Sequence, residues 1–351
     1  MDIIVGYSCN SSVGLRRRIG FFCNEKNIHL LRFERNSSVS YDFVVCTCSG
    51  DLLGVLEYAR KGGKVVFDYV DDMLSIRDLS IHNYFTILFR FFVGRSTFRF
   101  VTYKTLLLDL IKISTCCTCS NSTVVSQLKK LNRNVFCVWD NMYDIHTSDS
   151  PLQWDRRKDE ILSSVRIGWE GLPSNFKHLL IVRKALIELQ KEYDVEILIF
   201  SKVKSWRDRI YYLMLYIFYL RGVCFQFDEW NISSIATKLL TCDICIIPLD
   251  ACDPVAQGKP VNKYFGILLL GIPVLVSPIQ SYVALSSSAK DPFFVHDEKD
   301  WYIKISKLLF DLSFRRDVSV IQNEIAQGLP TKNQLLEAWF DVFKFVGIKE
   351  F

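Results

Sequence analysis

Two lysines in the second half of the sequence have the spacing of a phosphate-binding site. Lys259 and Lys263 lie four residues apart where we expect a helix to begin, near Val261, after an apolar run that ends at Pro248. Residues four apart share one side of a helix, and a helix start carries unpaired N–H groups and partial positive charge. The pattern fits a diphosphate, and it fits equally well a pair of solvated lysines at an ordinary helix start.

Three carboxylates form a second candidate site. Asp68, Asp71 and Asp72 lie at the carboxyl end of a strand that we predict at 64–69. A carboxylate at the end of such a strand can take the proton of a hydroxyl as a general base. Aspartate is also favoured there as a capping residue. We favour the catalytic interpretation and rank Asp72 ahead of Asp71.

Cysteine and glycine motifs narrow the chemistry. Spacings such as Cys46-x-Cys48 and Cys242-x-x-Cys245 resemble those of zinc ligands, but these cysteines fall in or beside predicted buried strands, so we expect core thiols and no metal. The motifs G-x-G-x-x-G, G-x-x-x-x-G-K-S/T, G-x-S-x-G and H-E-x-x-H are absent. Their absence disfavours a nicotinamide dehydrogenase, a P-loop kinase, a serine hydrolase and a zincin.

The elements that would position these residues are those of an α/β protein. The chain has 351 residues, enough for about two domains, and a net charge of +5, too small for a nucleic-acid-binding footprint. Short β-branched runs alternate with helical patterns, as in doubly wound parallel sheets. The expected strands begin near residues 3, 29, 42, 64, 116 and 135, and again near 165, 195, 223, 244, 273 and 293. A polar stretch at 140–164 separates domains at 1–150 and 160–330, and 331–351 forms a closing helix that can cross back to the first domain.

The start of the chain and its longest apolar helix bear on its location. Residues 1–8 lack the pattern of a secretory signal, and no apolar run is long enough to span a bilayer, so we expect a cytoplasmic protein with reduced thiols. Segment 202–221 joins basic residues to an aromatic helix. It fits a helix packed in the protein, which we favour, or a contact with the inner face of a membrane. The residues for that contact are Trp206, Tyr211, Tyr212, Tyr216 and Tyr219.

The segment 242–282 resembles the donor-binding region of family 4-like GT-B glycosyltransferases (glycosyl transferases group 1). The resemblance lies in DICIIPL at 243–249, in Lys259, in the Asn262-Lys263 pair and in GIPVLVS at 271–277. Further segments match the family in order along the chain, at 64–72 (KVVFDYVDD), 118–131, 135–144, 165–171 (VRIGWEG), 195–201 and 227–230.

The resemblance implies two Rossmann-like domains facing across a cleft, an acceptor-side domain followed by a donor domain. The implied activity is hexosyl transfer from a nucleotide-diphosphate sugar, the co-substrate, to a glycan or lipid-linked acceptor in polysaccharide or glycoconjugate synthesis, with no metal or other cofactor and with retention of configuration. The implied donor-binding residues are Gly168, Gly171, Ser201, Lys202, Trp230, Pro248, Lys259, Asn262 and Lys263. The implied acceptor-side residues are Ser12, Gly14 and Arg16, although the arginines at 16–18 equally fit a solvated helix face.

One position departs from the family. Many members carry a glutamate in the pattern N-K-x-x-E, where it binds hydroxyls of the donor, and this chain has Gly266 there. The departure keeps two alternatives open, a non-catalytic two-lobed protein that binds a sugar or nucleotide, and a GT-B-fold nucleotide-sugar epimerase.

Overall fold

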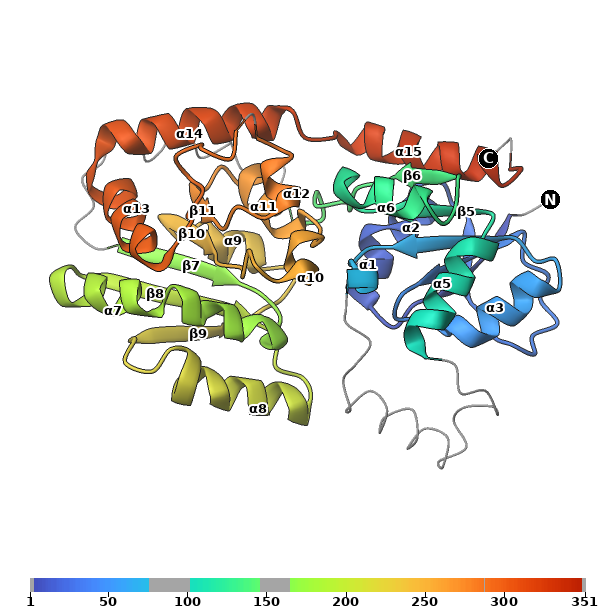
Figure 1. The fold of residues 1–351 in the computed structure, drawn as a ribbon, viewed down its shortest axis with the longest axis horizontal. Helices are drawn as coiled ribbons and strands as arrows, with labels where there is room; N and C mark the ends of the chain where they lie inside the picture. Colours follow the sequence, from blue (N-terminus) through green and yellow to red (C-terminus); the bar gives the residue numbers. More distant parts are fainter. Residues whose placement is uncertain (1–2, 76–101, 146–164, 287, 349–351) are drawn as a thin grey trace. The chain divides into compact units, whose positions relative to one another are not determined.

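The computed structural model describes residues 3–75, 102–145, 165–286 and 288–348. These residues form two compact units (Figure 1). Unit 1 comprises Met1–Asn141, Gly258–Pro260 and Pro330–Phe351, and unit 2 comprises Met142–Gln257 and Val261–Leu329. Most of the polar stretch at which we expect the domain boundary, 146–164, lies outside the described residues.

Unit 1 is built on a parallel sheet of six strands in the order β2-β1-β3-β4-β5-β6. All six predicted strands form, each within two residues of its expected start. They are β1 (Ile4–Ser8), β2 (His29–Arg32), β3 (Phe43–Thr47), β4 (Val65–Tyr69), β5 (Cys116–Cys119) and β6 (Val135–Cys137). The central strands β4 and β5 are buried along their whole length, which explains their unbroken apolar sequences.

Helices cover both faces of this sheet. One core joins the sheet to α2 and α15 and contains Phe22, Phe43, Trp339 and Phe343. The other joins it to α3 and α5. The helices are α1 (Ser12–Arg17), α2 (Ile19–Glu25), α3 (Leu52–Arg60), α5 (Tyr103–Ile113), α6 (Val125–Lys129) and α15 (Lys332–Phe345), with 3-10 turns η1 (Met73–Ser75) and η2 (Ser122–Val124). The closing helix α15 therefore completes a core of unit 1.

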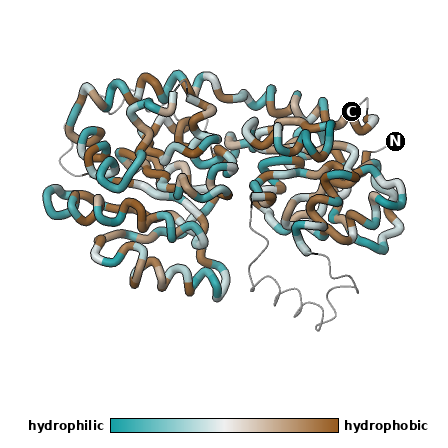
Figure 2. The backbone as a smooth tube through the Cα atoms, viewed as in Figure 1, coloured by the Kyte–Doolittle hydropathy of each residue, from teal (hydrophilic) through white to brown (hydrophobic). Residues whose placement is uncertain are grey.

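Unit 2 has a parallel sheet of five strands in the order β11-β10-β7-β8-β9. The strands are β7 (Val165–Glu170), β8 (Val195–Ser201), β9 (Phe225–Glu229), β10 (Ile244–Ile247) and β11 (Val274–Val276). The prediction of a strand starting at Phe293 is wrong. Phe294 makes only an isolated bridge with Val276 of β11, which is too short to form a strand. Figure 2 shows apolar stretches along the strands of both sheets.

The helices of unit 2 include one that carries part of the candidate site and one with an unusual surface. The first is α11 (Asn262–Leu269), and the second is α8 (Trp206–Met214), which continues as the π-helix η5 (Leu215–Tyr219). The others are η4 (Pro173–Ile181), α7 (Arg183–Glu192), α9 (Ile235–Leu239), α10 (Pro254–Gln257), α12 (Gln280–Val283), α13 (Glu298–Phe310) and α14 (Leu312–Gln327). Within the described part of the chain, no helix is long and apolar enough to cross a membrane.

Candidate functional site

Polar residues at the carboxyl ends of three adjacent strands of unit 2 contact one another. Trp230, which follows β9, donates a hydrogen bond from Nε1 to Oε1 of Glu170, the last residue of β7, at 3.0 Å. Its backbone N–H donates to the carbonyl of Ser201, the last residue of β8, at 2.9 Å. The Nζ atom of Lys202 lies 5.6 Å from the centroid of a Trp230 ring, within range of a cation–π interaction. The edge at which α/β sheets bind ligands thus carries a connected set of polar groups.

The hydroxyl of Ser201 stands out within this set. Ser201 is fully buried, and its Oγ makes no hydrogen bond to any residue that the structure describes. Buried hydroxyls are nearly always hydrogen-bonded, because leaving one unpaired costs about 1–3 kcal/mol. An orphaned hydroxyl at the ligand-binding edge of a sheet is suited to meeting a polar group of a ligand.

Lys263 lies beside the backbone at the end of β7. Its Nζ is 5.0 Å from the ring centroid of Trp169, and a Cβ atom added to Gly171 would come within 2.6 Å of that Nζ and 2.5 Å of the Trp169 ring. Glycine at 171 therefore leaves room for the ammonium group. The helix α11 begins at Asn262 after Val261, whose aliphatic side chain cannot cap it. The first-turn N–H groups and Lys263 together form an electropositive helix start.

The remaining predicted donor residues have different surroundings. Gly168 lies inside β7, where a Cβ atom would come within 2.6 Å of the Cys242 Sγ, so its glycine is required by packing within the sheet. Pro248 is buried just after β10. Lys259 precedes α11 and lies in unit 1, whereas Lys263 lies in unit 2. The helical spacing that we used to pair the two lysines is therefore wrong, because the helix begins only at Asn262, after Pro260.

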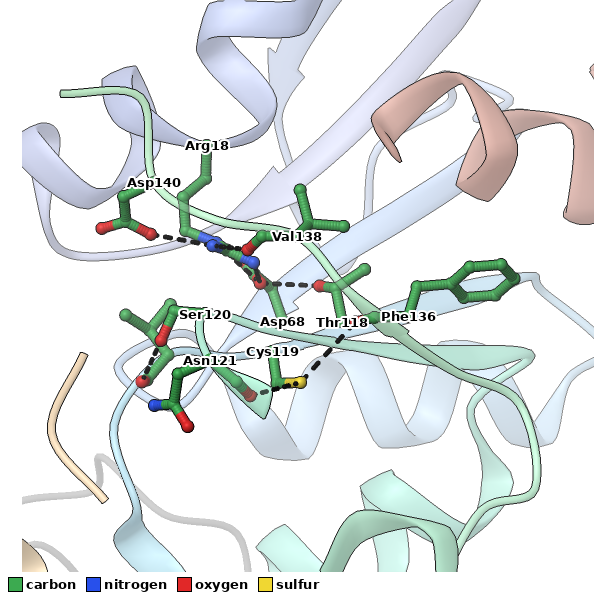
Figure 3. A network of polar contacts seen from close by, with 10 residues as sticks. Arg18, Asp68, Thr118, Cys119, Ser120, Asn121, Phe136, Val138 and Asp140 are labelled. Carbon is green, nitrogen blue, oxygen red and sulfur yellow. Dashed lines mark hydrogen bonds and ion pairs between the residues drawn. The ribbon is translucent and has the colours of Figure 1, made fainter. Parts of the chain in front are cut away.

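A buried ion-pair network lies at the carboxyl edge of the unit 1 sheet (Figure 3). Arg18 and Asp68 are each 1% exposed, and Nε of Arg18 donates to both carboxylate oxygens of Asp68, at 2.9 and 2.7 Å. Nη1 donates to Asp140 at 2.8 Å and to the Val138 carbonyl at 2.5 Å. Thr118 donates its hydroxyl proton to Asp68 at 2.6 Å. Burial lowers the pKa of Arg18, but the two carboxylates outweigh it and hold that pKa above its ordinary value.

We expected the arginines at 16–18 to face either the acceptor or the solvent, and Asp68 to be a candidate base. The network instead places Arg18 and Asp68 in a buried ion pair. Arg18 and Arg17 are buried, so the solvated helix face describes only Arg16. The carboxylate of Asp68 already accepts hydrogen bonds from a guanidinium and a hydroxyl, which suits a structural role better than proton transfer.

Asp72 is also occupied by local hydrogen bonds. It is buried, and its carboxylate accepts hydrogen bonds from Tyr69 Oη at 2.7 Å, from Ser75 Oγ at 2.5 Å and from the Ser75 backbone N–H at 3.3 Å. These contacts fix the turn η1 that follows β4. Asp72 therefore has the surroundings of a capping residue.

Asp71 is the exposed member of the cluster. Its carboxylate makes no hydrogen bond or ion pair within the described residues. Although the side chain is exposed, the protein around it partly desolvates the carboxylate, and this raises its pKa; the charge of Asp140 adds to the rise, and that of Lys259 opposes it. Of the three aspartates, Asp71 is therefore the one whose carboxylate accepts no hydrogen bond from another described residue.

The predicted acceptor-side residues lie where β1 passes into α1. Ser12 is the first residue of α1 and is exposed, as is Arg16. The N–H of Gly14 donates to the N-cap hydroxyl of Ser11 at 3.0 Å. Because the sheet is parallel, this loop lies at the same edge of unit 1 as the end of β4.

Two further observations concern metals and thiols. Among the described residues, no three His, Cys, Asp or Glu side chains lie together as a metal site requires. All twelve cysteines fall in the described part of the chain, and no disulfide joins them.

Comparison with solved structures identifies the architecture. HepE of Anabaena, in complex with UDP and glucose, superposes with a TM-score of 0.63 at 11% identity, over 98% of this chain and 100% of that one. A glycosyltransferase of Rickettsia africae gives 0.60 at 12% identity, over 98% of both chains. WaaG, a glycosyltransferase of lipopolysaccharide biosynthesis, gives 0.57 at 12%, over 98% and 100%. The chain has the GT-B fold. No protein-family model matches its sequence, and no curated protein is significantly similar to it.

The GT-B sequence pattern missed one residue of the site. Glu170 was not singled out, although it directly follows the strand predicted at 165–169, ends β7 in the structure and precedes the predicted Gly171. Only its position in the sequence could have pointed to it, because a carboxylate at the carboxyl end of a buried parallel strand lies at the edge where ligands bind.

The structure also explains the departure at Gly266. A Cβ atom at this position would come within 2.7 Å of Ile145 Cδ1 and 2.9 Å of Met142 Cε. Two apolar side chains of unit 2 therefore occupy the space next to Gly266. A side chain at 266 thus requires the ends of the Ile145 and Met142 side chains to shift.

We expect Gly266→Ala to lower the free energy of unfolding by about 1 kcal/mol, because overpacking costs about 1–3 kcal/mol and the gain in helix propensity returns about 1. The matched control is Gly328→Ala, where an added Cβ meets nothing closer than 3.5 Å. Urea unfolding of both variants tests this. Equal stability of the two would contradict the steric explanation.

Proposed function

We propose that this GT-B protein is a glycosyltransferase that moves a sugar from a nucleotide-diphosphate sugar to a glycan or lipid-linked acceptor. The observation that carries the proposal is the electropositive helix start at α11, with Lys263 beside the backbone of Gly171. The structural neighbours support it. HepE was solved with UDP and with UDP-glucose, and WaaG is described as a glycosyltransferase involved in lipopolysaccharide biosynthesis. By analogy, the reaction belongs to polysaccharide or glycoconjugate synthesis.

The proposed chemistry is stabilisation of the leaving diphosphate. As the bond between the sugar and the diphosphate breaks, negative charge builds on the phosphate oxygens. Lys263, the N–H groups at the start of α11 and, in our proposal, Lys259 and Asn262 neutralise that charge. These groups supply the positive charge, so we propose a metal-independent reaction without a further cofactor. Retention of configuration is proposed from the GT-B resemblance, and it requires the acceptor oxygen to bond to the sugar carbon on the face from which the diphosphate departs.

The edge formed by Glu170, Ser201, Lys202 and Trp230 is proposed to hold the nucleoside and the sugar. One oxygen of Glu170 accepts the Trp230 indole proton. A carboxylate has further acceptor capacity, and the Ser201 hydroxyl is unpaired within the described residues, so both can bind hydroxyl groups of a donor.

On the acceptor side we propose Asp71 as the general base, in place of Asp72. It takes the proton of the acceptor hydroxyl as that oxygen bonds to the sugar carbon. Ser12, Gly14 and Arg16, at the same edge of unit 1, are proposed to contact the acceptor. A cytoplasmic location fits a nucleotide-sugar donor.

The test is a panel of UDP-, GDP-, ADP- and TDP-sugars, measured by thermal stabilisation and by donor consumption with and without glycan acceptors. Glycosylated product supports the proposal. Binding without consumption supports the non-catalytic alternative, and conversion of one nucleotide sugar into its epimer supports the epimerase.

We expect Lys263→Met to weaken binding of the nucleoside diphosphate by about tenfold, since a charge-assisted hydrogen bond is worth roughly 1.5–3 kcal/mol. Lys184→Met is the control, because Lys184 is an exposed lysine of the same unit that pairs with Glu298. Titration calorimetry measures both. Unchanged affinity in the Lys263 variant would show that the phosphates bind elsewhere.

A further inference from the structure

The helix formed by α8 and η5 turns apolar residues toward the solvent. Trp206, Ile210, Leu213 and Ile217 are spaced by four, three and four residues, and so lie along one face of the helix. Their side chains are 67, 48, 58 and 46% exposed. We call these four residues the apolar stripe. A helix on a protein surface normally presents polar residues there, so this arrangement is inverted.

The opposite face of the same helix is the one that packs on unit 2. Leu215 is fully buried. The ring of Tyr212 lies 4.6 Å from that of Phe227, and the ring of Tyr216 lies 4.6 Å from that of Phe225; both phenylalanines belong to β9. The packing therefore fixes which face is outside. Of the set predicted from sequence, Tyr212 and Tyr216 contact the sheet, although Tyr216 also stays 46% exposed, and Trp206 and Tyr211 are exposed as well.

More apolar surface lies next to the stripe. Phe218, in η5, is exposed. The 3-10 helix η4 packs against both α8 and η5; it carries the exposed side chain of Leu180, and the exposed Leu172 directly precedes it. Figure 2 shows apolar stretches along α8 as well as in the strands. Several large apolar side chains exposed on elements that pack together are typical of an interaction site.

The charge around the stripe identifies the kind of partner. Segment 202–221 holds five basic residues and one acidic residue, Asp208, whose carboxylate accepts the N–H groups of Lys204 and Ser205 at the start of α8. Arg207 lies over the Trp206 ring, with its Cζ 5.5 Å from the centroid. The basic residues are Lys202, Lys204, Arg207, Arg209 and Arg221. An apolar helix face with basic flanks and a tryptophan at one end fits the interface of an anionic bilayer.

We propose that the apolar stripe and its basic flanks bind the surface of an anionic phospholipid bilayer, with the helix in the plane of the interface. A second copy of the chain is disfavoured as the occupant, because pairing two such faces brings like charges together. The proposal does not depend on the glycosyltransferase activity. The stripe lies on α8 and η5, outside the polar edge formed by Glu170, Ser201, Lys202 and Trp230, and Lys202 is the one basic flank that also belongs to that edge.

The test measures sedimentation of the full chain with vesicles of phosphatidylcholine containing 0, 30 or 60% phosphatidylglycerol. We expect binding that grows with the anionic fraction and falls on raising NaCl from 0.1 to 0.5 M. Ile210→Ser with Leu213→Ser should weaken binding at least about tenfold, because both apolar anchors are lost. Arg207→Glu with Arg209→Glu should weaken it by a similar factor. The matched control is Ile303→Ser with Val320→Ser, two exposed apolar residues of α13 and α14, and it should bind as the wild type does.

Three results would overturn the proposal. They are no binding to anionic vesicles, equal binding of the stripe variant and the control, and wild-type dimerisation in analytical ultracentrifugation that the stripe variant abolishes. Because the replaced side chains are exposed, all variants should keep the wild-type melting temperature. If the stripe variant melts at a lower temperature, the charge variant still tests the proposal independently. Donor binding measured on the same variants separates this surface from the transferase site.

Discussion

Arg18→Met is expected to lower the free energy of unfolding of unit 1 by about 3–5 kcal/mol, the cost of leaving a buried charge without its partner. The substitution removes the hydrogen bonds that Arg18 donates to Asp68, Asp140 and the Val138 carbonyl. The two carboxylates would remain buried close together without a cation. Methionine keeps much of the volume, so the loss reports mainly on the charge.

The measurement must report on unit 1, because a chain of two units need not unfold in one step. Hydrogen exchange of the amides in β4, β5 and β6 does so. The control is Arg35→Met, which removes an ion pair with Asp51 whose side chains are 40 and 39% exposed. An exposed pair contributes about 0–1 kcal/mol, so this variant should differ little from the wild type.

A double variant distinguishes the proposed cause from a simple loss of packing. Adding Asp68→Asn to Arg18→Met removes one uncompensated charge while keeping the shape of the side chain, so part of the lost stability should return. If Asp68→Asn deepens the loss instead, the carboxylate is not the source of the penalty, and the buried network has another basis.

The strand pattern could be predicted from sequence because every buried strand is a short, nearly continuous apolar run. Eleven of the twelve predicted strands form. The exception near Phe293 has the same apolar character but forms one bridge, which shows that apolar sequence alone does not determine pairing. The GT-B fold followed from the order of motifs, and no single motif would have sufficed.

The roles of individual site residues were harder to predict, because they depend on partners far away in sequence. Arg18 meets Asp68 fifty residues later and Asp140 beyond that, and no local pattern marks it as the residue that occupies the Asp68 carboxylate. Asp72 was predicted to be the better base, but its carboxylate accepts hydrogen bonds from Tyr69 and Ser75. The basic and aromatic composition of 202–221 predicted a helix there, but only the packing of that helix on β9 shows which face is exposed.

Asp71→Asn is expected to lower kcat by about 10²–10⁴-fold, the usual contribution of a general base, with the donor–acceptor pair that gives the highest turnover. The amide cannot accept the acceptor proton but has nearly the same shape. Because the residue makes no hydrogen bond or ion pair within the described chain, the variant should melt at the wild-type temperature and bind nucleotide unchanged.

The pH profile gives this prediction a second readout. A general base acts when it is deprotonated, so kcat/KM should fall as the pH falls through its pKa. Partial desolvation and the charge of Asp140 raise the pKa of Asp71, so the fall should be centred above about 4, the ordinary value for aspartate, and should be absent in Asp71→Asn. Asp72→Asn, in which an amide NH2 group replaces one of the two oxygens that accept from Tyr69 and Ser75, should lower the melting temperature and leave the acidic limb in place. An acidic limb that survives in Asp71→Asn, with turnover near that of the wild type, would move the base to another group.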